Sequence, residues 1–177
     1  MKKYKLGLVL GRFQIFHKGH ELIIDSALKN CEKVLIFIGS SEKSNTFINP
    51  FDYEYRKKII KEVYDNDNII IAPLPDLGVG NVPKWGQYVI ENAIKVIGMP
   101  DLIIYGIEDK CETWYKDYQN LDYLKVDRNG IDISSTKLKE IIINGNYDEY
   151  LKYVNPKLIK YYNYQKEVLI KLKEENK

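Results

Sequence analysis

The stretch LGLVLGRFQIFHKGH, residues 6–20, decides the fold class. Its first five residues are almost all apolar on consecutive positions, which is typical of a parallel strand covered on both faces. Gly11 ends this run, and both histidines of the chain, His17 and His20, follow on either side of Gly19. A buried strand that leads through a glycine-bearing loop into a helix is the start of a β-α unit.

The rest of the chain repeats this pattern. Four further apolar runs are VLIFIG (34–39), NIIIA (68–72), DLIIYG (101–106) and YLKV (123–126). Helical patterns lie between them at 19–30, 52–64, 85–97 and, more briefly, 112–118. This alternation predicts an α/β fold, an open parallel five-stranded Rossmann-like sheet with helices on both faces.

After the fifth run the pattern is helical. Ser134 or Ser135 can cap a helix that runs to 144–145, a further turn or two covers 147–153, and Pro156 opens a last helix. At 177 residues the chain has room for one well-buried core. We therefore expect a single domain over 1–177, with an α/β core at 1–130 and, at 131–177, the ISST helix and the C-terminal helices packed alongside.

Charge and cysteine content exclude several classes of protein. The chain has 27 Lys and Arg against 25 Asp and Glu, a net charge of +2, which does not favour a nucleic-acid or membrane partner. Cys31 and Cys111 stand alone, as expected of reduced thiols in the cytoplasm. The first apolar run is shorter than the ~7–15 residues of a signal peptide, and no run approaches the ~18 residues of a membrane span. We expect a cytoplasmic protein, and homo-oligomer formation stays open.

The loop around the histidines is the candidate site. In an open parallel sheet, ligands bind beyond the carboxyl ends of the strands, where the connections diverge. His17 and His20 are three residues apart at a helix start and share a face near the positive end of the helix dipole, which suits an anion. Two surface histidines without function are the alternative. No further Cys, His or carboxylate set completes a zinc site, and neither the P-loop nor the full GxGxxG pattern occurs.

Three motifs in chain order resemble those of one enzyme family. GRFQIFHKGH (11–20) is similar to the GRFQPFHxGH signature of nicotinamide-nucleotide adenylyltransferases of the archaeal type and their bacterial relatives, within the HxGH nucleotidylyltransferase superfamily. IGSSEKSNTFINPFDYEYR (38–56) resembles their GSxxKSxTxxNPFTxxER region, and ISSTKLK (133–139) resembles ISxTxxR. The likeness covers the chain from about residue 6 to 139. Each motif stands at a predicted strand-to-helix junction.

The resemblance implies transfer of AMP from ATP to nicotinamide mononucleotide (NMN), which gives NAD and pyrophosphate with Mg²⁺ as cofactor. The attacking phosphate is already anionic at neutral pH, so catalysis can rest on positioning and on cations around the α-phosphate. His17, His20 and Arg12 are the implied catalytic residues. The loop agrees with this chemistry because it carries His, Lys and Arg but no carboxylate base.

The resemblance also implies two sets of binding residues. For ATP they are Gly11, Arg12, Phe13, His17, Gly19, His20, Gly106, Glu108, Ser134, Ser135, Thr136 and Lys139. For NMN they are Phe13, Gly39, Ser40, Asp76, Asn81 and Trp85. Glu108 or Asp109 would accept hydrogen bonds from ribose hydroxyls, with an exposed loop acid as the alternative. The Ser134 region could equally be an ordinary helix cap, and Trp85 could be a core residue instead of a stacking platform for the pyridine ring.

The chain departs from the family pattern at a few positions. Lys139 replaces an Arg, which keeps the charge but loses the bidentate fork. Ile15 replaces a Pro, which changes loop stiffness more than chemistry. Trp85 follows Asn81 by four positions instead of three. Arg56 matches the family's Arg after NPF, and a structural role is open for it.

Other functions therefore remain open. One is another nucleotidylyltransferase of the superfamily that acts on pantetheine phosphate, glycerol 3-phosphate or riboflavin phosphate. A nucleotide sensor without turnover is disfavoured because both histidines are retained. A class I aminoacyl-tRNA synthetase fragment is disfavoured because the chain has neither a KMSKS-like loop nor a basic excess. The sequence does not choose between nicotinamide and nicotinate mononucleotide.

Overall fold

The computed structural model describes residues 2–78, 82–106, 111–128 and 130–175, and its sheet is the predicted one. The strands are β1 (Tyr4–Gly11), β2 (Cys31–Gly39), β3 (Ile69–Leu74), β4 (Leu102–Tyr105) and β5 (Asp122–Lys125). They are all parallel, in the order β3-β2-β1-β4-β5. The helices are α1 (Lys18–Asn30), α2 (Tyr53–Val63), α3 (Val82–Val96), α4 (Cys111–Trp114), α5 (Ser135–Ile143), α6 (Tyr147–Tyr153), the 3₁₀ helix η1 (Pro156–Tyr161) and α7 (Tyr162–Glu175).

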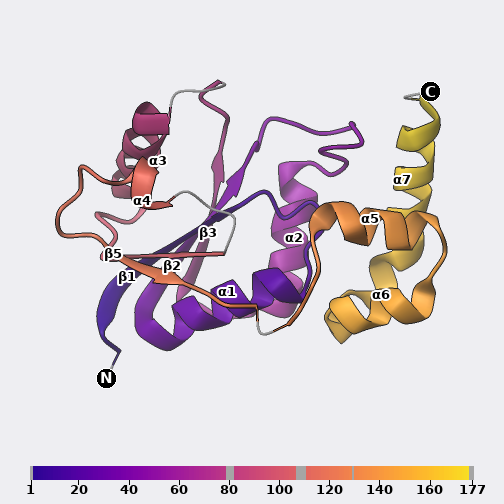
Figure 1. The fold of residues 1–177 in the computed structure, drawn as a ribbon, viewed down its shortest axis with the longest axis horizontal. Helices are drawn as coiled ribbons and strands as arrows, with labels where there is room; N and C mark the ends of the chain where they lie inside the picture. The colour runs from indigo at the N-terminus through magenta and orange to yellow at the C-terminus, as the bar shows by residue number, and fades with distance from the viewer. Residues whose placement is uncertain (1, 79–81, 107–110, 129, 176–177) are drawn as a thin grey trace.

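Helices cover both faces of the sheet. Successive side chains of a strand point to opposite faces, so neighbours such as Leu35 and Ile36 enter different hydrophobic clusters. One cluster packs the sheet against α1, α2 and the C-terminal helices, and the other packs it against α3 and α4. Figure 1 shows α3 and α4 together on one side, with α1 and α2 across the sheet from them. Burial on both faces explains why the strands are apolar on consecutive positions.

The strand order places the switch point beside β1. The chain steps from β1 outward to β2 and β3, then crosses to β4 on the other side of β1 and continues to β5. β1 and β4 are adjacent, and the helices that follow them, α1 and α4, lie on opposite faces of the sheet. A ligand site is expected in the crevice between the loops after β1 and β4.

The C-terminal helices extend the molecule beyond α2 (Figure 1). The last helix differs from its prediction, because its first six residues are 3₁₀. The amide of Leu158 donates to the carbonyl of Asn155 (2.9 Å), a bond three residues back that tightens this turn. Helix α4 is shorter than predicted because the chain closes a turn at Tyr118, whose amide donates to Tyr115 (3.0 Å). No helix in the described part of the chain is long and apolar enough to cross a membrane.

Candidate functional site

The two histidines begin α1 and stack on each other. His17 is the N-cap residue, and its Nδ1 accepts a hydrogen bond from the amide of Gly19 (3.1 Å). Nδ1 of His20 accepts from the amide of His17 (3.3 Å). The ring centroids are 3.8 Å apart at an angle of 20°. Because Nδ1 is the acceptor in both rings, each neutral ring carries its proton on Nε2 and offers that N–H as a donor.

Burial keeps this pair neutral. His17 is 1% exposed, and its burial, aided by the nearby charge of Arg128, lowers its pKa to about 3. The pKa of His20 is also lowered well below its usual value, first by burial and then by His17 and Arg128. The rings of Phe13 and Phe16 lie 4.9 and 5.5 Å from the His20 ring. The pair can therefore donate hydrogen bonds at neutral pH without carrying charge.

Arg128 is a cation of this site that the sequence analysis missed. Its Nη1 donates to the carbonyl of Ile133 (2.8 Å). A Cβ atom added to Gly106 would lie 3.5 Å from its Nη2, and one added to Gly19 would lie 3.6 Å from its Nε. The guanidinium thus lies between the end of β4 and the start of α1, and its buried Nε has no hydrogen-bond partner among the described residues. Its position just beyond the carboxyl end of β5 is the sequence signal that could have identified it.

The second predicted anion motif begins α5 and meets the first motif at a cavity. Ser134 is an N-cap whose Oγ accepts from the amide of Lys137 (3.1 Å). The hydroxyl of Ser135 donates to the carbonyl of Ile15 (3.2 Å), which ties α5 to the loop after β1. The cavity has a volume of about 160 Å³ and is lined by Arg12, Gln14, Phe47, Ile48, Ser135, Thr136 and Lys139. Two cations and two hydroxyls among these residues suit part of an anionic ligand.

Lys139 is buried in the wall of this cavity, with 5% of its surface exposed. Its ammonium donates to the backbone carbonyls of Phe47 and Ile48, both at 2.8 Å. Burial, with a smaller effect of Arg12, lowers its pKa to about 8. The residue predicted from the ISxTxxR motif therefore holds the loop between β2 and α2.

Arg56 lies beneath the same loops and is 1% exposed. Its guanidinium donates to the backbone carbonyls of Arg12 (3.0 Å), Gly39 (2.8 Å), Ser40 (3.1 Å) and Asp52 (3.1 Å). Phe13 and Ser40 have positive φ angles of 53° and 46°, a conformation that costs a non-glycine residue about 1–2 kcal/mol. The hydrogen bonds of Arg56 to Arg12, Gly39 and Ser40 stabilise the backbone at these two turns.

Of the described residues predicted to bind NMN, Phe13 follows β1, and the others lie at the ends of β2 and β3 or on α3. The hydroxyl of Ser40 donates to Asp76 (2.9 Å), and Lys43 forms an ion pair with the same carboxylate. Burial raises the pKa of Asp76, but the hydrogen bonds from Lys43 and Ser40 outweigh it and leave the pKa lowered. Trp85 is half-buried on α3, 5.5 Å from the Tyr88 ring, and packs against the cluster beneath α3. The predicted residues Asn81, Glu108 and Asp109 lie outside the described residues.

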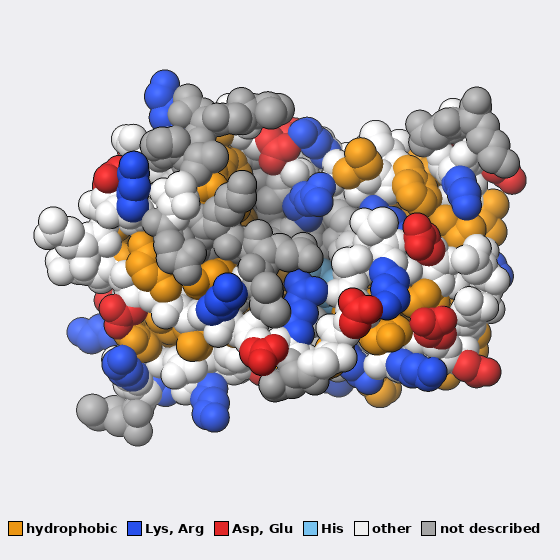
Figure 2. Space-filling model, in the orientation of Figure 1, with side chains coloured by type: hydrophobic (Ala, Val, Ile, Leu, Met, Phe, Trp, Pro, Cys, Tyr) orange, Lys and Arg blue, Asp and Glu red, His pale blue; other side chains and the backbone are white. Residues whose placement is uncertain are grey.

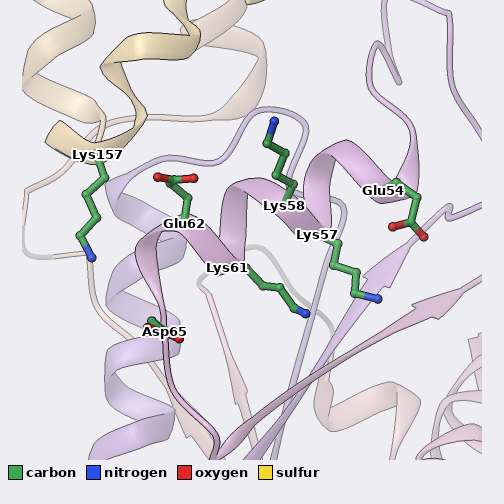
Figure 3. A pocket seen from close by; sticks show the side chains of 7 residues that line it. All are labelled: Glu54, Lys57, Lys58, Lys61, Glu62, Asp65 and Lys157. Atoms are coloured by element: carbon green, nitrogen blue, oxygen red, sulfur yellow. The ribbon is translucent and has the colours of Figure 1, made fainter.

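The surface around the histidines is cationic. Figure 2 shows Lys and Arg side chains gathered around a small visible area of His near the middle of this face. A larger groove of about 750 Å³ runs along α2 (Figure 3) and is lined by Glu54, Lys57, Lys58, Lys61, Glu62, Asp65 and Lys157. Positive and negative groups almost balance there, and Glu62 pairs with Lys160. Because none of the predicted site residues lines that groove, the candidate site is the carboxyl edge of the sheet.

Known proteins resemble the chain over this same region. Residues 8–141 match the family described as cytidylyltransferase-like. The nicotinamide-nucleotide adenylyltransferase of Saccharolobus solfataricus is 38% identical over 88 residues, which is 47% of this chain and 50% of that protein. Its counterpart from Methanococcus maripaludis is 27% identical over 144 residues, 81% of each chain.

The solved structures agree with these sequence matches. A bifunctional NMN adenylyltransferase/ADP ribose pyrophosphatase from Francisella tularensis superposes with a TM-score of 0.80 at 29% identity, over 98% of this chain and 53% of that one. A second structure from this organism, a complex with AMP and a Mn ion, gives a TM-score of 0.77 at 30% identity. The chain spans about half the length of the Saccharolobus and Francisella proteins.

Proposed function

The chain belongs to the cytidylyltransferase-like family, and from that premise we propose that it is a nicotinamide-nucleotide adenylyltransferase. A phosphate oxygen of NMN attacks the α-phosphorus of ATP. The bond from that phosphorus to the oxygen bridging the β-phosphate breaks, and pyrophosphate leaves with the electron pair. The products are NAD and pyrophosphate. The relatives named for this activity and the Francisella structure support the choice of reaction.

The histidine pair carries the proposal. Two stacked imidazoles at the start of α1 offer their Nε2–H groups next to the guanidinium of Arg128. This set of donors lies at the switch point, beside the positive end of a helix dipole. We assign His17 and His20 to the oxygens of the α-phosphate, where negative charge builds up in the transition state. Arg12 and Arg128 would hold the remaining phosphate oxygens.

The proposed reaction does not require a base from the protein. A phosphate monoester is largely dianionic at neutral pH because its second pKa is about 6, so its oxygen attacks without losing a proton to the protein. Catalysis then depends on alignment and on preorganised donors. Neutral imidazoles suit this role because they donate hydrogen bonds over a wide pH range and do not retain the pyrophosphate as strongly as imidazolium ions would.

We propose that Mg²⁺ enters with ATP as a metal–nucleotide complex. The described residues include no group of three or more His, Cys, Asp or Glu side chains that could hold a metal ion. Mg²⁺ keeps several waters and is commonly bound through substrate phosphates. The Francisella structure contains a Mn ion together with AMP, which supports use of a divalent metal with the nucleotide.

We assign acceptor recognition to the side chains beyond β2 and β3. Ser40 and Asp76 already contact each other there, and Asp76 would accept hydrogen bonds from the acceptor. The exposed part of Trp85 would stack on the pyridine ring. The backbone at Gly39, the last residue of β2, and the turn at Phe13 would line the space between the acceptor and ATP.

The test is an assay of purified protein with ATP, Mg²⁺ and one acceptor at a time. NMN should give NAD and an equal amount of pyrophosphate, and nicotinate mononucleotide in a parallel reaction measures the preference between the two. Pantetheine phosphate, glycerol 3-phosphate and riboflavin phosphate should give no pyrophosphate. Pyrophosphate release with one of these and not with NMN would replace the proposed acceptor. ATP binding without turnover on any acceptor would indicate a nucleotide sensor instead.

A further inference from the structure

Lys139 touches two parts of the site at once. We propose that it is a positioning residue that couples the two substrate sites, because two of its N–H groups hold the loop 40–51 and the third is left for a phosphate group of ATP. The identities of the two substrates rest on the proposed function. The hydrogen bonds from Lys139 to the loop do not depend on these identities.

The hydrogen bonds of Lys139 define its role. An ammonium group has three N–H donors and no acceptor. Two donors are used by the carbonyls of Phe47 and Ile48, at 2.8 Å each, and Nζ also lies 5.5 Å from the centre of the Phe47 ring. These bonds cross more than 90 positions of sequence and join α5 to the middle of the loop.

The third donor faces an anion site. The cavity beside Lys139 is also lined by Arg12, Ser135 and Thr136, and its lining among the described residues includes no carboxylate. Lys139 is buried and buried charges are normally paired, so an anionic ligand that also contacts Arg12 is its missing partner. At about 160 Å³ the cavity is smaller than the roughly 300–1,000 Å³ of pockets for whole drug-sized ligands. It therefore suits a phosphate group and not a nucleoside.

The loop carries the contact onward to the acceptor side. Its first residue, Ser40, and its fourth, Lys43, both bind the carboxylate of Asp76. Its last residue, Phe51, is held at both backbone groups by the amide of Gln14 (2.7 and 3.0 Å). Lys139 holds the part between these two sets of contacts. If that part moves, Lys43 and Asp76 lose their arrangement, although Lys139 itself lies on the ATP side.

Amide hydrogen exchange of the ligand-free protein tests the hold on the loop. The amides of Thr46 and Asn49 report on the middle of the loop because they bond across it, to the Asn49 carbonyl and the Thr46 hydroxyl. In Lys139→Met these two amides should exchange about tenfold faster. The Phe51 amide, held by Gln14, should be unchanged. Lys139→Arg, which keeps donors and charge, should restore protection.

Lys137→Met is the matched control. It lies on the same helix, but its ammonium pairs with exposed Asp132, so the loop amides should exchange as in the wild type. Unchanged exchange of Thr46 and Asn49 in Lys139→Met would overturn the hold on the loop.

Inorganic pyrophosphate tests the third donor without any variant. In the wild type, Thr46 and Asn49 should stay protected when pyrophosphate binds, because the anion takes the unused N–H. Faster exchange on adding pyrophosphate would mean that the anion displaces the carbonyls, and it would overturn the proposed division of donors. This readout remains available if Lys139→Met does not fold.

Calorimetric binding tests the coupling. Lys139→Met should lower the affinity for pyrophosphate at least tenfold and the affinity for NMN about fivefold. Lys137→Met should change neither affinity. Weaker pyrophosphate binding with unchanged NMN binding would reduce Lys139 to a simple phosphate ligand. Because neither exchange nor pyrophosphate binding needs turnover, a failure to make NAD would overturn the proposed function and leave the loop result standing.

Discussion

The loop after β1 and the segment after β3 leave the same edge of the sheet but are built differently. Between β1 and α1, the side chains from Phe13 to His17 are all 4% exposed or less. After β3, Leu77 is 47% exposed, and Asp76 is held by a surface ion pair with Lys43. The first loop is packed into the core and closed by a helix cap, whereas the second depends on side chains from other parts of the chain.

This difference separates chemistry from recognition. The proposed donors for the α-phosphate are fixed by a helix start and by close packing, which leave little freedom for movement. The acceptor side relies on exposed side chains and long-range contacts, which are weaker and easier to exchange. In the proposed function, nucleotidyl transfer would therefore depend on the more rigid part of the site, and acceptor choice on the more adaptable part.

The largest expected effect is on the rigid side. His20→Ala removes one of the proposed donors to the α-phosphate and should lower kcat about 10²–10³-fold, as loss of one oxyanion donor does. Steady-state assays of NAD formation measure it. Asp25→Asn, on the same helix but bonded to Tyr64, is the control and should leave kcat unchanged. A His20→Ala enzyme with near-normal kcat would remove His20 from the chemistry.

Arg56 is an exception to this comparison. It donates to backbone carbonyls both in the loop after β1, at Arg12, and at Ser40 on the acceptor side. Arg56→Met leaves four backbone carbonyls without their donor and should lower the free energy of unfolding by about 2–4 kcal/mol. Urea unfolding measures this loss. Arg56→Lys keeps the charge but not the forked guanidinium, so its free energy of unfolding should lie between those of the wild type and Arg56→Met. A loss below about 1 kcal/mol would show that the loop ends hold without Arg56.

A substitution of Trp85 tests the proposed recognition of the acceptor. Stacking on a base is worth about 1–3 kcal/mol, so Trp85→Ala should raise KM for NMN roughly tenfold and leave KM for ATP unchanged. Trp114→Ala is the matched control, because Trp114 packs against the same cluster from α4. It should reduce stability without changing either KM. If both variants behave alike, Trp85 is a core residue.

The smallest effect is a pH dependence of stability. The pKa of His17 is about 3 in the folded protein and about 6.5 when unfolded, so the unfolded state binds more protons between these values. Stability is then complete above pH 6.5 and falls as the pH drops toward 3, by about 1 kcal/mol between pH 6.5 and 5.5. His17→Asn keeps a capping acceptor and should show a shallower fall in urea unfolding. Parallel curves for both proteins would contradict the lowered pKa.

Most of the fold could be predicted because the strands are buried on both faces. The apolar run at 34–39 identified β2, but the strand begins three residues earlier, at Cys31. Glu32 and Lys33 are exposed, and yet this part of β2 still pairs with β1, as Tyr4 with Cys31 and Leu6 with Lys33. Backbone pairing continues past the point where side chains stop being apolar, so hydrophobic patterns place strand centres better than strand ends.

The site residues that the sequence predicted stand in short motifs, each of them local in the chain. His17, Gly19 and His20 form one motif, and the helix cap that unites them is local. Arg128 and the partners of Lys139 escaped prediction because their contacts join segments far apart in the chain. No local pattern records such contacts.

By itself the sequence determined the order of strands and helices along the chain and the switch-point position of the first loop, and it predicted an anion site there. These properties follow from burial periodicity and from the ends of secondary structure, which act over a few residues. Only the tertiary structure decided that Arg128 faces the histidines, that Arg56 holds the ends of β1 and β2, and that Lys139 holds the loop 40–51. Buried cations bind whichever carbonyls and anions the packed chain brings to them, and that choice is made by the fold as a whole.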